Sequence, residues 1–195
     1  PETFDAYLRA MFQYRKETQE GYQKGIEILE EALANDPGSA LAYAALGQGY
    51  SELVHSVLPV MEAMKRARAA TEKAVELDPT LAEAHLALGL KQLYGDFDFE
   101  ASENRFAQVV EFGPDGNQYY LDAQYFRGWA LFKQNRLEDS LLAFTEMIDE
   151  HFPDDETLMA ADGAELEVLN DSLRLMALMF DYLGDWNEIA RFYDE

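Results

Sequence analysis

A proline-ended motif recurs along the chain and constrains its fold more than any other feature. Asp36-Pro37 is echoed by Asp78-Pro79 and, more loosely, by Gly113-Pro114, each after an Ala-, Val- or Leu-containing segment. Together with Pro153, these prolines lie 42, 35 and 39 residues apart by subtraction. Glycines 47, 89 and 128, in segments that follow the first three prolines, are 42 and 39 residues apart. Such spacing indicates a chain of structural repeats.

The repeat favours helical hairpins. Proline lacks a backbone N–H and disfavours helix in the residue before it, so each Pro ends a helix. Small residues allow two helices to approach closely, and one hairpin alone cannot bury its apolar face, so stacking supplies the core. The predicted helix pairs, of which we expect the last to be cut short within its second helix, are 3–35, 39–78, 81–113, 118–152 and 165–195.

The residues of this pattern resemble the tetratricopeptide repeat (TPR) family over almost the whole chain. The first helix of a TPR unit carries an aromatic residue, then Leu-Gly, then Tyr, and Tyr43, Leu46-Gly47 and Tyr50 match this order. The second helix carries a small residue and an aromatic residue and is followed by Pro. The positions that match it are Ser102, Phe106, Val109 and Pro114, and, with one extra residue, Ser140, Phe144, Met147 and Pro153.

The resemblance implies an all-α fold, a right-handed TPR superhelix (α-solenoid) of about five helical hairpins. We expect a single array over 1–195, a fragment of a longer protein because the chain opens at Pro1 without an initiator Met. Its units would be 3–38, 39–80, 81–115, 118–153 and 165–195. The opening decapeptide 1–10 resembles TPR segments of bacterial multidomain regulators, and 165–176 resembles Gram-negative envelope TPR proteins.

Two segments depart from the repeat. The second unit has about eight extra residues around Glu52–Met61, which we interpret as a longer first helix restarted at Pro59, with an apolar docking lip as the alternative. Asp154–Ala164 forms a long acidic connection. It is either a simple loop or a segment that folds over a face of the stack.

The charge of the chain excludes several kinds of partner. With 15 Lys and Arg against 38 Asp and Glu, the formal net charge is -23, and such a surface repels phosphate backbones and anionic lipid. From 137 onward the chain has 17 acidic residues and only two basic ones, Arg174 and Arg191. This excess of negative charge either keeps the protein soluble or forms a surface for a basic partner. The sequence has no Cys and no membrane-span pattern. We therefore expect no nucleic acid partner and no membrane insertion. The absence of Cys fits the bacterial cytoplasm and the periplasm equally well.

The residues do not form a recognisable catalytic or metal-binding pattern. His55, His85 and His151 fall in different units, and His85 occupies an aromatic packing position, so we expect it in the core. Asp96, Asp98 and Glu100 alternate, but a calcium loop needs a longer run of oxygens with a central Gly. We interpret Asp98 as a helix N-cap, and we expect neither enzymatic activity nor a cofactor.

One basic stretch stands out in this acidic chain. Lys65, Arg66, Arg68 and Lys73 fall on the predicted second helix of the second unit, whose free face would lie on the outside of a TPR coil. We expect these cations to offset local acidic residues rather than to bind nucleic acid.

The family resemblance implies a partner-binding groove lined by first helices. Carried onto this chain, its lining residues are Tyr7, Met11, Tyr14, Gln48, Leu86, Leu90, Tyr125, Trp129, Phe132 and Arg174. TPR domains that bind the C-terminal carboxylate of a chaperone carry Lys at the positions of Ala44 and Leu86. We therefore do not expect this chain to bind a chaperone C-terminus. The stripe is apolar and aromatic, which suits a helix or an extended peptide, although the same residues could instead pack neighbouring helices.

Three functions follow from this pattern. The first is a protein–protein interaction scaffold that binds a peptide or helix in a bacterial assembly. The second is a regulatory or sensor module of a multidomain transcription regulator or cyclase. The third is self-association through the last hairpin.

Overall fold

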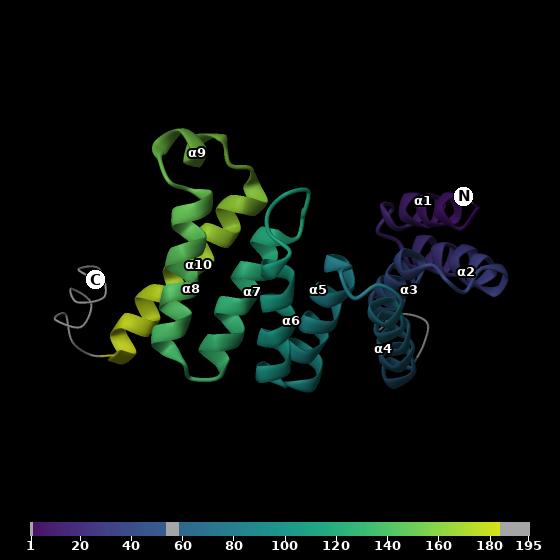
Figure 1. The fold of residues 1–195 in the computed structure, drawn as a ribbon, viewed down its shortest axis with the longest axis horizontal. Helices are drawn as coiled ribbons and strands as arrows, with labels where there is room; N and C mark the ends of the chain where they lie inside the picture. Colours follow the sequence, from purple (N-terminus) through teal and green to yellow (C-terminus); the bar gives the residue numbers. More distant parts are fainter. Residues whose placement is uncertain (1, 54–58, 184–195) are drawn as a thin grey trace. The chain divides into compact units, whose positions relative to one another are not determined.

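The part of the chain that the structure describes is helical in all its regular elements (Figure 1). The computed structural model describes residues 2–53 and 59–183. Its helices are α1 (Glu2–Tyr14), α2 (Gln19–Asn35), α3 (Ala40–Glu52), α4 (Val60–Leu77), α5 (Ala82–Lys91), the π-helix η2 (Gln92–Asp96), α6 (Phe99–Glu111), α7 (Tyr120–Lys133), α8 (Leu137–His151), α9 (Asp155–Ala160) and α10 (Gly163–Leu183). The predicted all-α solenoid fold is confirmed.

The repeated prolines mark helix ends. Helices α2, α4, α6 and α8 end at Asn35, Leu77, Glu111 and His151, two or three residues before Pro37, Pro79, Pro114 and Pro153. The helix that follows the first proline begins behind an N-cap, where the Ser39 side chain accepts a hydrogen bond from the backbone N–H of Ala42. Proline and cap together determine where the chain turns.

The chain divides into two compact units, 1–96 and 97–195. The first contains α1 to α5 with η2, and the second contains α6 to α10. The division falls inside the predicted third repeat, 81–115, between η2 and α6. The bounds of the five predicted repeats therefore stay a prediction.

The core of the first unit is built around a tyrosine that fits against glycines. Tyr14 of α1 is 4% exposed, and its hydroxyl donates a hydrogen bond of 3.1 Å to the carbonyl oxygen of Ala45 in α3. A Cβ added at Gly49 would lie 2.1 Å from that hydroxyl, and one added at Gly25 would lie 2.3 Å from the ring. The Tyr14 ring fits here only because Gly25 and Gly49 have no side chain.

The second unit repeats this device with a phenylalanine. Phe144 of α8 is fully buried, and a Cβ added at Gly128 of α7 would lie 2.7 Å from its ring. The Ser140 hydroxyl, also fully buried, donates a hydrogen bond of 2.8 Å to the Gly128 carbonyl. Leu175, Met176 and Met179 of α10 join Phe144 in one apolar cluster.

The first unit ends in a wider helical turn, η2, which no sequence pattern predicted. Leu93 of η2 is buried, and Asp96 at its end accepts hydrogen bonds from the Lys91 ammonium. Asp98 then caps α6 by accepting a hydrogen bond from the backbone N–H of Ala101, as predicted. Asp96 and Asp98 thus have structural partners.

The acidic connection 154–164 is not a simple loop, because α9 occupies its first half. Asp154 and Thr157 form a capping box at its start. None of the six side chains of α9 is buried, and Met159 is 87% exposed. A short helix with such exposure does not cover an apolar face, so that alternative for the connection is wrong.

The extra residues of the second predicted repeat, 39–80, are only partly described. Helix α3 ends at Glu52, and Pro59 is the N-cap residue of α4 rather than its first-turn proline. The centre of the predicted docking lip, 54–58, lies outside the described residues together with His55. Residues 184–195, the end of the last predicted pair, lie outside them as well.

A Gly128→Ala substitution tests the close approach of α7 and α8. The added methyl group would collide with the Phe144 ring, and overpacking of this kind costs about 1–3 kcal/mol of unfolding free energy. Urea unfolding followed by circular dichroism should show a lower midpoint. The matched control is Gly163→Ala at the start of α10, where no atom lies within 4 Å of the added Cβ. Equal midpoints for the two variants would contradict the role of Gly128.

Asp122, in the first turn of α7, offers a test by pH. Burial raises the pKa of its carboxyl group, so the folded state disfavours the charged form. The resulting destabilisation is absent below the unfolded pKa and grows as pH rises through the folded value. Asp122→Asn should therefore raise the urea midpoint at pH 7, with a gain that shrinks as the pH is lowered toward about 4. A gain independent of pH would contradict this origin.

Candidate functional site

The predicted groove residues of the first unit do not form one exposed surface. Tyr14 is buried in the core, so its assignment to the groove is wrong: the gaps at Gly25 and Gly49 admit its ring to the interior. Tyr7 and Met11 are half-buried against the same core, whereas Gln48 is exposed. Burial, with the nearby Glu83 carboxylate as a smaller cause, raises the pKa of Tyr7.

The two leucines predicted from α5 are largely packed. Leu86 is buried and Leu90 is half-buried, which agrees with packing as the alternative to binding. His85 is also buried, and its Nε2 atom lies 2.9 Å from the carbonyl oxygen of Pro79, which confirms its predicted core position. The first unit thus uses most of its predicted groove residues to hold its own helices together.

The predicted residues of the second unit do come together. Tyr125 and Trp129, one helical turn apart on α7, are half-buried against the apolar cluster that α10 shares. Phe132 lies edge-on to Trp129, with ring centroids 6.0 Å apart, and the Lys133 ammonium lies 5.2 Å from the centre of the Trp129 ring. With Asp171 and Arg174 of α10, these aromatic residues make up what we call the α7–α10 surface.

Asp171 connects the two helices of this surface. The Tyr125 hydroxyl donates a hydrogen bond of 2.6 Å to Asp171 Oδ2, and the Trp129 indole N–H lies 2.8 Å from the Tyr125 oxygen and 3.3 Å from the same Oδ2. Hydrogen bonds to a charged acceptor are stronger than those between neutral groups. The carboxylate therefore fixes two aromatic side chains in place while one face of the cluster remains open.

A hollow of about 690 Å³ adjoins this cluster. Its wall combines the Tyr125 ring and Val168 with the charged groups of Glu167, Asp171 and Arg174. The lining is thus part apolar and part polar, rather than the wholly apolar stripe that the resemblance implied. It can accept an apolar side chain next to a positively charged one.

The segment from α8 to α10 is strongly negative, whereas the α7 side of this surface carries the Lys133 ammonium beside Trp129. Between 137 and 183 there are 13 acidic residues and Arg174 alone among Lys and Arg. Of these carboxylates, only that of Asp139 forms a salt bridge within the described part of the chain, with Arg136. The other carboxylates of 137–183 therefore carry charge that no salt bridge among the described residues offsets.

Three of the four cations in the basic stretch of α4 pair with nearby carboxylates, as predicted for local charge balance. Arg66 forms a salt bridge with Glu62, Arg68 with Glu72, and Lys73 with Glu76. These pairs lie within one helix and offset local charge.

The acidic residues include no group of three or more that could hold a metal ion among the described residues. In that same part of the chain, no helix is long and apolar enough to cross a membrane.

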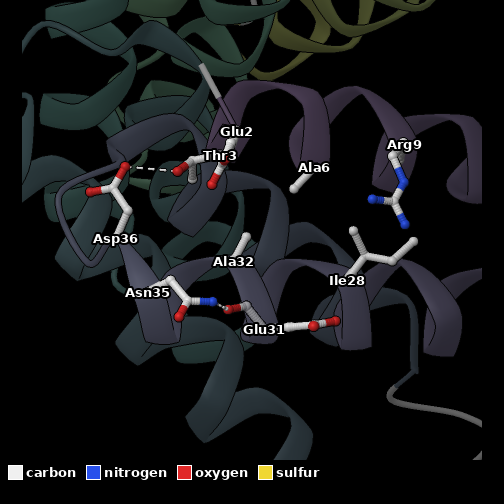
Figure 2. A pocket seen from close by; sticks show the side chains of 9 residues that line it. All are labelled: Glu2, Thr3, Ala6, Arg9, Ile28, Glu31, Ala32, Asn35 and Asp36. Carbon is white, nitrogen blue, oxygen red and sulfur yellow. Dashed lines mark hydrogen bonds between the residues drawn. The ribbon is translucent and has the colours of Figure 1, made fainter.

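A second hollow, of about 550 Å³, lies between α1 and α2 (Figure 2). At one end the Thr3 hydroxyl donates a hydrogen bond of 2.7 Å to Asp36, and this bond lowers the pKa of the Asp36 carboxyl. Arg9 lies at the other end, above Ile28 (Figure 2). The hollow contains no aromatic side chain and has fewer features of a binding site than the α7–α10 surface.

Asp171 is the residue of the candidate site that sequence reasoning missed. It lies three residues before Arg174, which the family pattern did assign to the groove. Its position on the same helical face was a usable signal, but its hydrogen bonds join residues 46 and 42 positions apart and depend on how α7 and α10 pack together.

Comparison with known proteins identifies the fold. No family model and no curated protein matches the sequence. Among solved structures, the TPR protein TTC0263 of Thermus thermophilus is 15% identical, with a TM-score of 0.66, over 88% of this chain and 80% of that one. MamA is 18% identical, with a TM-score of 0.67, over 99% and 89%.

PilW, a type IV pilus biogenesis factor, is 16% identical, with a TM-score of 0.64, over 92% of this chain and 78% of that chain. Identities this low establish the fold alone. The fold of this chain is the all-α solenoid of the tetratricopeptide-repeat proteins that its sequence resembles.

Proposed function

We propose that this chain is a protein–protein interaction scaffold that holds a peptide or helix of a partner on its α7–α10 surface, within a bacterial assembly. Helical repeat solenoids present extended surfaces for partners, and the fold of this chain supports that general role. The observation that carries the proposal is the Tyr125–Trp129–Asp171 cluster beside the hollow.

The aromatic residues of this cluster suit a binding role energetically. Tyr and Trp are enriched among residues that contribute most to binding, because each offers a large contact area with few rotatable bonds. Tyr125 and Trp129 are already held by Asp171, so little conformational entropy is lost when a partner contacts them. Half-buried rings fixed in this way support recognition of an apolar or aromatic side chain.

The charge of the surface points to a basic partner. A segment with Lys or Arg beside its apolar anchor would place a cation near Asp171 and Glu167, both of which line the hollow. Arg174, on the same wall, suits a single acidic group or the peptide carbonyls of the partner. Complementary charge of this kind accelerates association and excludes acidic competitors.

A Trp129→Glu variant tests the surface directly. We expect a displayed library of random peptides to yield binders of the wild-type chain that the variant does not retain, because the substitution removes the anchor ring and adds charge. The matched control is Leu142→Glu, which places the same charge at an exposed leucine of α8 outside the surface. Circular dichroism checks that both variants keep their helical content. Peptides retained equally by all three proteins would contradict the proposal.

An Asp171→Asn variant tests the expected charge of the partner. Asn keeps a side-chain oxygen for the hydrogen bonds of Tyr125 and Trp129 but removes the negative charge. We expect the enriched peptides to be basic and to bind the variant about tenfold more weakly, with a reduced dependence on salt concentration. The matched control is Asp149→Asn, an exposed carboxylate of α8 that does not line the hollow. Enriched peptides without Lys or Arg, or equal losses in both variants, would contradict a basic partner.

A further inference from the structure

Helix α1 carries an exposed apolar stripe on the side opposite its buried face. Phe4, Leu8 and Phe12, each separated by four residues, are 56%, 50% and 64% exposed. The buried face of α1 consists of Thr3, Ala6, Ala10 and Tyr14 and is already satisfied within the first unit. The stripe is therefore additional to what the fold of this unit requires, and patches of this kind mark interaction sites.

The stripe has a symmetric sequence. Leu8 lies midway between Phe4 and Phe12, so an antiparallel copy of the helix would place Leu8 against Leu8 and each Phe4 against the Phe12 of the other copy. Residues spaced by four form a ridge along a helix, and two such ridges can interdigitate. A patch that is complementary to itself in this way is what a two-fold symmetric interface needs.

Charge favours a second copy at this place in the chain. Although the chain carries a net charge of -23, residues 1–17 contain three acidic and three basic residues and are neutral. Two copies therefore meet here with less repulsion than at the strongly acidic second unit. Asp5 and Arg9 lie on the flank of the stripe, and neither forms a salt bridge with another described residue.

An antiparallel pair would give both residues a partner. With the two-fold axis at Leu8, Asp5 of one copy lies within one helical turn of Arg9 of the other, and the same contact occurs twice by symmetry. The helix dipoles are also antiparallel in this arrangement, which is more favourable than the parallel dipoles of a parallel pair. We propose that the chain forms an antiparallel homodimer in which the Phe4–Leu8–Phe12 stripe of α1 packs against that of a second copy.

Analytical ultracentrifugation over a wide concentration range tests this proposal. One helix from each copy buries a small area, so we expect a weak dimer that dissociates on dilution. Leu8→Glu should weaken dimerisation about tenfold or more. The matched control, Leu173→Glu, alters a leucine of α10 that is 49% exposed and should leave the dimer unchanged. If the chain remains monomeric at its highest soluble concentration, the proposal of a homodimer is overturned.

A charge exchange tests the orientation. Arg9→Asp should weaken the dimer, because it replaces the cation that faces Asp5 of the other copy with a second carboxylate. The double variant Asp5→Arg/Arg9→Asp should restore it, because the exchanged pair meets in the same geometry. Failure of the double variant to recover dimerisation, with helical content intact in circular dichroism, overturns the antiparallel arrangement. Peptide binding at the α7–α10 surface is measured separately, because the two surfaces belong to different units and share no residue.

Discussion

Close contact between helices at residues without a side chain is the interaction on which the rest of this fold depends. In the second unit, the Phe144 ring occupies the space that a Cβ at Gly128 would need, and the Ser140 hydroxyl binds the carbonyl of that glycine. In the first unit, Tyr14 fits against Gly25 and Gly49 in the same manner. A helical hairpin has little area to bury, so its stability relies on the density of these contacts.

The fold could be predicted from the sequence to the extent that local signals determine it. The prolines and the Asp98 cap mark helix ends directly, because their effects act within a few residues. Tyr14 was misplaced because its burial depends on glycines of α2 and α3, which come close only in the folded unit. The π-helical turn η2 and the short helix α9 were missed because neither carries an apolar periodicity of its own.

The candidate site shows the same division between local and distant information. The family resemblance placed Tyr125 and Trp129 together on α7, and both pack against one apolar cluster. The role of Asp171 was not predictable, since it arises when α10 packs against α7 and brings a carboxylate to two aromatic donors. The resulting surface is more polar than the family pattern implied, which narrows the range of partners that would fit it.

The burial pattern also sorts the seven methionines of the chain by their chemical exposure. Met147, Met176 and Met179 lie in the core of the second unit, whereas Met159 projects from α9 almost fully into solvent. Oxidation of an exposed thioether adds a polar group where it disturbs no packing, whereas oxidation of a core methionine disrupts the apolar cluster. Met159 would thus react with an oxidant before the buried methionines do. Oxidation of Met147 or Met179 would require that α8 and α10 separate first.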